Sequence, residues 1–126
     1  NKFNENILYI NNFINFDLIW NTGIGFGLLS SNSILFYNFI TIFIIFVVII
    51  LFYIVFKGDN NEKFILSLVI GGAIGNLYDR VSYNAVPDFI DLHYGNFHWF
   101  TFNVADIFIT LGITVFIMIG IFKKDR

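Results

Sequence analysis

The chain has 126 residues, of which 57% are hydrophobic and 21% aromatic but only 13% are charged. Soluble domains carry about 25% charged residues, so this composition indicates an integral membrane protein with one small domain. The net charge is −2 and no basic patch stands out, which argues against nucleic acid as a partner. Because cysteine is absent, disulfides, thiolate metal sites and cysteine nucleophiles are excluded.

The N-terminal part of the chain, residues 7–29, is predicted to form a small β-element outside the membrane. Apolar side chains alternate with other residues between positions 14 and 20, and a period of two favours a strand. Two asparagines at 11–12 predict a turn before that strand. Three alternating glycines, of which Gly23 is the first, follow Asn21, so the backbone there is able to bend or to approach a ligand closely.

Three later stretches, residues 34–56, 64–81 and 102–122, are predicted to cross the membrane. A bilayer core takes about 20 helical residues to cross, and each stretch is close to that length and mainly apolar. Ser33 is a predicted N-cap of the first helix. Lys57 and Lys63 flank the loop between the first two spans, and further cations follow the last span. The positive-inside rule therefore places the loop between the first two spans, and the end of the last span, on the cytoplasmic side of the membrane.

This topology leaves residues 1–33 and 82–101 together on the outer side of the membrane. The second of these segments is rich in aromatic residues and is predicted to be an interface-seated loop with aromatic anchors. The chain begins at Asn1 rather than at a methionine, which suggests that it starts inside a longer product.

Two aspartates, Asp88 and Asp106, lie at the outer edges of apolar segments. A carboxylate at membrane depth costs about 2.5–3.5 kcal/mol, so a functional reason for it is expected. Two neighbouring carboxylates share one proton, and such a pair is able to activate water and protonate a leaving amine without a metal or organic cofactor. Residue spacing alone leaves Asp91 as a competitor of Asp88. The macrodipole at a helix N-terminus offers a purely structural reason for Asp106.

Several other residues of the apolar segments also have structural interpretations that require no catalytic role. Gly71 and Gly75 form a GxxxG pattern, which is typical of close helix packing. Asp79 and Arg80 are predicted to neutralise each other locally, whereas Asn76 is interpreted as a buried hydrogen-bonding residue that orients a neighbour or a substrate.

Two histidines, His93 and His98, lie near Asp91 in the outer segment. Their spacing matches no strong metal-ligand motif, so they are interpreted as solvated residues at the membrane interface and no metal is predicted.

Four ordered segments resemble the motifs of bacterial lipoprotein signal peptidase, the type II signal peptidase. They are Asn21-Thr-Gly-Ile-Gly-Phe-Gly27, Gly71-Gly-Ala-Ile-Gly-Asn-Leu-Tyr-Asp-Arg80, Val86-Pro-Asp-Phe-Ile-Asp91 and Phe102-Asn-Val-Ala-Asp106. The resemblance implies a helical membrane bundle with a small extracytoplasmic β-element, in which the first transmembrane helix of the family is missing from this chain. Residues 1–126 are accordingly expected to be one membrane peptidase domain.

The resemblance also implies an activity and a site. The expected enzyme is a monomeric aspartyl endopeptidase without a cofactor, located in the bacterial inner membrane among its lipids. It removes signal peptides from diacylglyceryl-modified prolipoproteins by cleaving before the lipidated cysteine, at the extracytoplasmic face. The catalytic pair of the family falls on Asp88 and Asp106, and its substrate-binding residues fall on Asn21, Gly23, Asn76, Arg80 and Asn103.

Two other classes of function remain as alternatives. The acids in the membrane segments are also consistent with an ion or proton relay in a small transporter subunit. A structural subunit with locally neutralised acids is the second alternative, and it predicts that the aspartates tolerate substitution by asparagine.

Overall fold

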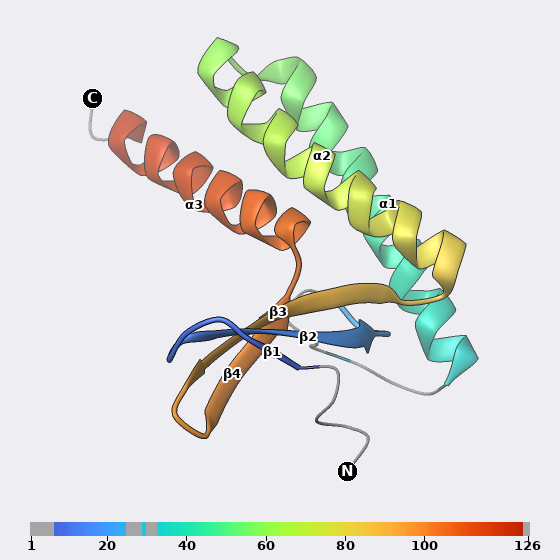
Figure 1. Ribbon diagram of the computed structural model, residues 1–126. Coiled ribbons are helices and arrows are strands. Elements are labelled where there is room, and N and C mark those ends of the chain that lie inside the picture. Colours follow the sequence, from blue (N-terminus) through green and yellow to red (C-terminus); the bar gives the residue numbers. More distant parts are fainter. Residues whose placement is uncertain (1–6, 25–28, 30–32, 125–126) are drawn as a thin grey trace. The chain divides into compact units, whose positions relative to one another are not determined.

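The computed structural model describes residues 7–24, 29 and 33–124, and within them it contains four strands and three long helices. In chain order these elements are β1 (Leu8–Tyr9), β2 (Ile14–Asn21), α1 (Ile34–Lys57), α2 (Asn60–Tyr83), β3 (Val86–Tyr94), β4 (Phe97–Phe102) and α3 (Val104–Lys124) (Figure 1).

The elements divide into two compact units. The sheet unit contains the four strands, residues 34–40 of α1, residues 79–83 of α2, and Asn103. The helix unit contains residues 41–57 of α1, residues 60–78 of α2, and all of α3.

The strands of the sheet unit are all antiparallel and follow the order β1-β2-β3-β4. The predicted turn precedes β2, where the Asn11 side chain accepts hydrogen bonds from the backbone N–H groups of Phe13 and Ile14 at 2.7 and 2.8 Å. The predicted β-element at residues 7–29 is therefore confirmed as far as residue 24. Gly25 and Gly27, also expected to approach a ligand, lie outside the described residues.

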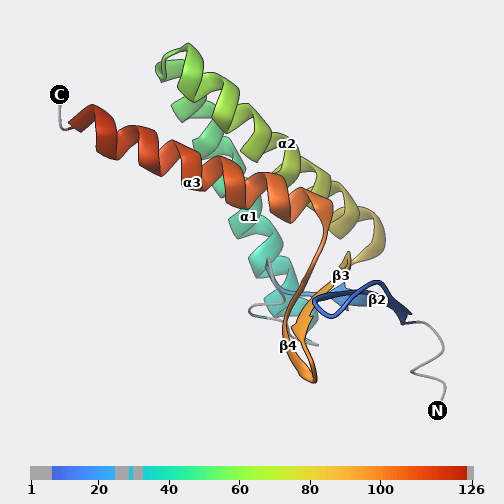
Figure 2. The ribbon, with the colours of Figure 1, turned by 60° about the vertical axis from the view of Figure 1, so that its left-hand side comes forward.

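The prediction of a loop over residues 82–101 is wrong, because most of this segment forms the β3–β4 hairpin. Tyr94 pairs with Phe97 across a two-residue turn whose first residue, Gly95, has a φ of 58°. Glycine adopts this left-handed conformation without steric cost, and a two-residue loop with such residues is typical of hairpins. The hairpin leads into α3 through the single residue Asn103 (Figure 2).

The three predicted spans are confirmed as helices, and each is long and apolar enough to cross a membrane. Ser33 caps α1 as predicted, since its hydroxyl accepts the N–H of Phe36 at 3.3 Å. However, α2 begins at Asn60 rather than near residue 64. Asp59 and Glu62 form a reciprocal capping box, with N–H to carboxylate distances of 2.9 and 3.2 Å, and this box starts the helix one turn earlier.

The basic residues of the helix unit gather at one end of it, as the topology prediction requires. Lys123, at the end of α3, contacts both Asp59 and Glu62, at the start of α2, and its Nζ lies 3.0 Å from Glu62 Oε1. The few buried apolar side chains of this unit include Val48, Leu66 and Val69. Most of the other helical side chains are exposed and apolar, as expected where lipid replaces water.

Candidate active site

Asp88 lies on β3 and is the most deeply buried carboxylate of the described residues, with 1% of its surface exposed. The amide of Asn103, directly before α3, donates a hydrogen bond to Asp88 Oδ1 at 2.9 Å. Asp88 and the nearby guanidinium of Arg80 also attract each other electrostatically. An amide donor and a cation both favour the ionised form of a buried carboxylate, which would otherwise be costly to remove from water.

Arg80 lies in the last turn of α2 and is 3% exposed. Its guanidinium donates to the carbonyl of Gly23 and lies 5.2 Å from the ring centre of Tyr37, whose hydroxyl donates back to the Arg80 carbonyl at 2.6 Å. The predicted Asp79–Arg80 pair is wrong, since no ion pair joins these two within the described part of the chain. Adjacent helical residues do not face each other, and Arg80 instead attracts Asp88.

The turn after β2 presents the Gly23 carbonyl to Arg80. Asn21 is buried, and its side chain accepts the N–H of Gly23 at 2.8 Å while donating to the carbonyl of Ile24 at 2.6 Å. Both ends of this amide therefore bond to the backbone that follows, as is typical of asparagine in turns. Arg80 Nη1 is buried without a hydrogen-bond partner among the described residues, so the site retains one free donor.

The second acid, Asp106, lies in the first turn of α3 within the helix unit and is 5% exposed. Asn76 of α2 donates its amide to Asp106 Oδ1 at 3.0 Å. The N-terminal end of a helix carries partial positive charge, which also stabilises a carboxylate there by about 0.3–1 kcal/mol at exposed sites. Asn76 is thus a hydrogen-bonding residue that holds a neighbour, as predicted, but it is only half-buried rather than buried.

Close contact between α2 and α3 depends on Gly72 and Gly112 rather than on the GxxxG pair. A Cβ atom at Gly72 would lie 2.8 Å from the carbonyl oxygen of Ala105, and one at Gly112 would lie 2.4 Å from Val69 Cγ2. A Cβ atom added at Gly71 or Gly75 would meet no atom of a neighbouring element within 4 Å in the described part of the chain. The packing interpretation of that pair is therefore wrong, because the pattern specifies a spacing and not the helix face that is in contact.

The two histidines and Asp91 come together on the β3–β4 hairpin. His98 Nδ1 lies 2.8 Å from Asp91 Oδ2, and the rings of His93 and His98 are 5.3 Å apart. His93 is buried, so the prediction that the histidines are solvated is wrong for it, whereas His98 is exposed as predicted. No group of three acidic or histidine side chains in the described residues has the geometry of a metal site. Asp91 is engaged with His98, whereas Asp88 is held by Asn103.

Two sets of polar residues therefore surround the two acids. Tyr37 is a partner that the sequence did not predict, and its position 43 residues before Arg80 gives no local signal for the contact. The sheet unit contains Asn21, Gly23, Arg80, Asp88 and Asn103, and the helix unit contains Asn76 and Asp106.

Membrane-spanning helices together with buried, amide-bonded carboxylates define a membrane protein equipped for polar chemistry. Comparison with known protein families gives the same class. A family described as "Signal peptidase (SPase) II" matches residues 1–122, and the chain belongs to that family. It is therefore a peptidase of the signal peptidase II type, as the sequence motifs predicted.

Curated relatives and solved structures support the same assignment. The chain is 51% identical to the lipoprotein signal peptidase of Pelagibacter ubique (strain HTCC1062) over 119 residues, which cover 94% of this chain and 72% of the relative. It is 41% identical to the lipoprotein signal peptidase of Francisella tularensis subsp. mediasiatica (strain FSC147) over 124 residues, with 94% and 76% covered.

Two structures titled as bacterial membrane enzymes solved by the in meso method resemble the fold. The first has a TM-score of 0.74 and 29% identity, covering 95% of this chain and 73% of that one. The second has a TM-score of 0.65 and 33% identity, covering 90% and 72%. The predicted class, a helical membrane protein with a small β-element, is thus confirmed, and the transporter alternative is not favoured.

Proposed function

We propose that the protein is an aspartyl endopeptidase that removes the signal peptide from diacylglyceryl-modified prolipoproteins by cleaving before the lipidated cysteine. The observation that carries the proposal is that Asp88 and Asp106 are both buried and that each accepts a hydrogen bond from an asparagine amide. Asn103, which holds Asp88, precedes Asp106 by only three residues in the chain. This short interval supports a joint role for the two acids.

In the proposed reaction, one aspartate is ionised and the other is protonated. The ionised carboxylate removes a proton from water as the oxygen of that water bonds to the carbonyl carbon of the scissile peptide. The protonated carboxyl group donates to the carbonyl oxygen, and a proton then passes to the amine as the C–N bond breaks. Water and peptide are converted to acid and amine, so the chemistry requires no metal or organic cofactor.

The neighbouring polar residues are proposed to hold the substrate backbone and the acids. Arg80 has a buried Nη1 without a partner among the described residues, and a carbonyl of the bound signal peptide would satisfy this donor. Gly23 and Asn21 form the turn beside Arg80 and would border the same strand of substrate. Asn76 and Asn103 would act as positioning residues through the carboxylates that they contact.

The proposed location is the bacterial inner membrane, with the site at the extracytoplasmic face and the enzyme acting as a monomer. Lys123 and the start of α2 mark the basic end of the helix unit, which the positive-inside rule assigns to the cytoplasm. Asp106 lies at the opposite end of α3 from Lys123, as extracytoplasmic chemistry requires.

Substrate choice tests this function. Membranes containing the protein are incubated with a prolipoprotein that carries the diacylglyceryl group, and separately with a matched form in which the target cysteine is replaced by serine and remains unlipidated. Cleavage of the lipidated form alone, insensitive to a metal chelator, is the expected result. Equal cleavage of both forms would overturn the assigned substrate class, and loss of cleavage with chelator would overturn the metal-free chemistry.

A further inference from the structure

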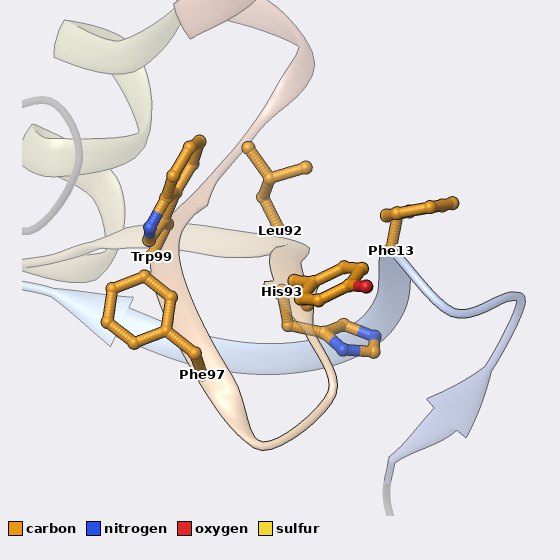
Figure 3. A pocket seen from close by; sticks show the side chains of 6 residues that line it. Phe13, Leu92, His93, Phe97 and Trp99 are labelled. Carbon is orange, nitrogen blue, oxygen red and sulfur yellow. The ribbon is translucent and has the colours of Figure 1, made fainter.

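Tyr37 differs from the aromatic residues of the β3–β4 hairpin in the partner of its ring. The rings of Phe97 and Trp99 meet edge to face, with centres 6.0 Å apart, and both line an apolar pocket of the hairpin (Figure 3). The ring of Tyr37, in the first turn of α1, lies instead against a cation, with its centre 5.2 Å from the Arg80 guanidinium. A cation within about 6 Å of a ring centre is attracted by the electrons of the ring face. Tyr37 therefore contacts the residue that is proposed to hold the substrate backbone.

The hydroxyl of Tyr37 holds the backbone from which that guanidinium extends. It donates to the Arg80 carbonyl at 2.6 Å, and the same carbonyl accepts the N–H of Asn84 at 3.0 Å. Asn84 follows the end of α2 and has a φ of 60°, so this second bond is the left-handed cap of a helix C-terminus. A carbonyl oxygen has two lone pairs. Tyr37 therefore takes the one that the cap leaves, and ties the end of α2 to the start of α1.

Tyr37 is itself held in place, as a support for another side chain must be. Its backbone N–H donates to the carbonyl of Ser33 at 3.0 Å, and the hydroxyl of Ser33 caps the same turn through Phe36. Ile40, three residues further along α1, is buried, and Tyr37 is half-buried. Residues 34–40 belong to the same compact unit as Arg80. The first turn of α1 is thus a fixed point within the sheet unit.

Four contacts converge on Arg80 within this unit. Tyr37 contributes two of them, through its hydroxyl and its ring. The other two are the Gly23 carbonyl, which accepts from the guanidinium, and Asp88, which attracts it electrostatically. The donors of a guanidinium lie in one plane in fixed directions, so a ring against that plane helps to decide where each N–H group points. Tyr37 is therefore in a position to orient Arg80 relative to Asp88.

We propose that Tyr37 is a positioning residue for signal-peptide cleavage and acts through Arg80. Its hydroxyl sets the place of the last turn of α2, and its ring sets the plane of the guanidinium. This inference rests on the proposed function, in which Arg80 holds the substrate backbone beside Asp88. Because small misplacements of groups near reacting atoms reduce rates strongly, loss of Tyr37 should lower kcat more than it raises KM.

Two substitutions separate the hydroxyl from the ring. Tyr37→Phe removes the hydroxyl alone, and kcat/KM for a diacylglyceryl-prolipoprotein in membranes should fall by about threefold, as expected for one hydrogen bond. Tyr37→Leu removes the ring as well, and kcat/KM should fall by about 20-fold. Wild-type kinetics in Tyr37→Leu would overturn the proposal. So would a loss that appears only in KM.

Tyr53 offers a matched control on the same helix. Its ring also contacts a cation, with Lys57 Nζ 5.5 Å from the ring centre, but it lies in the helix unit at the other end of α1. Tyr53→Phe and Tyr53→Leu remove the same atoms and should leave kcat and KM within about twofold of the wild type, as exposed positions usually do. Equal losses at Tyr53 and Tyr37 would show a general effect on α1 and overturn the role of Tyr37.

A double-mutant cycle tests whether the ring acts through Arg80. The ratio of kcat/KM between Tyr37→Phe and Tyr37→Leu isolates the ring, and it should fall from about sevenfold to below about twofold when Arg80→Gln removes the cation. An unchanged ratio would show that the ring supports the fold alone. If Arg80→Gln cleaves too slowly, thermal unfolding in detergent replaces the rates. Loss of the ring should then lower Tm more with Arg80 present than in Arg80→Gln, and equal decreases would overturn the coupling.

The wild-type protein distinguishes failure of this inference from failure of the proposed function. Cleavage by the wild type together with normal kinetics in Tyr37→Leu would overturn the role of Tyr37 alone. No cleavage of the lipidated substrate by the wild type would overturn the proposed function, and this inference with it.

Discussion

Replacing Gly72 with alanine should separate the two helices that hold the Asn76–Asp106 hydrogen bond. The new Cβ atom would lie 2.8 Å from the carbonyl oxygen of Ala105 and 2.8 Å from Ile109 Cγ1, against ordinary contacts of 3.4–4 Å. The Ile109 side chain is able to rotate, but the Ala105 carbonyl is backbone, so α3 itself must move by several tenths of an ångström. Such a shift lengthens the 3.0 Å bond between Asn76 and Asp106 toward the limit of a normal hydrogen bond.

The expected effect on activity is larger than the effect on stability. Overpacking costs about 1–3 kcal/mol, but alanine exceeds glycine in helix propensity by about 1 kcal/mol, so the net loss of stability is small. A displacement of about 1 Å near reacting groups is able to reduce rates about 100-fold, so the smaller shift here should slow cleavage by about tenfold or more. Cleavage of diacylglyceryl-prolipoprotein in membranes measures the rate, and thermal unfolding in detergent measures the stability.

Gly75→Ala is the matched control, because this position lies on the same helix with no atom within 4 Å of the added Cβ. It should cleave within about twofold of the wild type and be slightly more stable. Truncating Ile109 to alanine in the Gly72→Ala protein should restore activity only in part, since the contact with the carbonyl remains. Wild-type cleavage by Gly72→Ala would refute the reasoning.

Three further predictions follow from individual contacts. Asn103→Ala should lower kcat by about 10- to 100-fold with little change in KM, because it removes the amide that holds Asp88, and an unchanged kcat would contradict this role. Arg80→Lys should reduce the rate of cleavage by about tenfold or more, because lysine lacks the planar guanidinium of arginine. Wild-type kinetics in this variant would show that cleavage does not require the guanidinium group. The backbone N–H of Glu62, followed by Lys123, lowers the pKa of Asp59 below its usual 3.8, so the carboxylate stabilises the fold at neutral pH and loses this effect as the pH falls through the lowered pKa. Asp59→Ala should therefore unfold at a lower temperature than the wild type at pH 7 but not at pH 2, and a gap that persists at pH 2 would refute the assignment.

The membrane spans were predictable from the sequence because uninterrupted apolar stretches admit few other structures. The start of α2 was missed, although Asp59 and Glu62 have the spacing of a capping box, since the charged segment was interpreted as a loop. The β3–β4 hairpin was missed because its aromatic residues suggested an interfacial loop. Gly95 followed by an asparagine was the local signal that could have revealed its turn.

The candidate site was predictable as a set of residues but not as a set of contacts. Motifs identified both aspartates and their asparagines, yet the bond from Asn103 to Asp88 depends on how β3 pairs with β4 and is not encoded by sequence spacing. The contacts of Arg80 could not be predicted from sequence spacing for the same reason. Its neighbour in the chain is an acid, but its contacts are with Tyr37 and Gly23, which are distant in sequence.

The most direct test of the proposed mechanism compares Asp88→Asn and Asp106→Asn, each alone, for cleavage of a diacylglyceryl-prolipoprotein in membranes. Asparagine keeps the size of each side chain and removes only its ability to ionise or to carry the shared proton. Each substitution should reduce cleavage by about 1,000-fold or more while the protein still inserts into the membrane. Normal cleavage by either variant would contradict the two-aspartate mechanism.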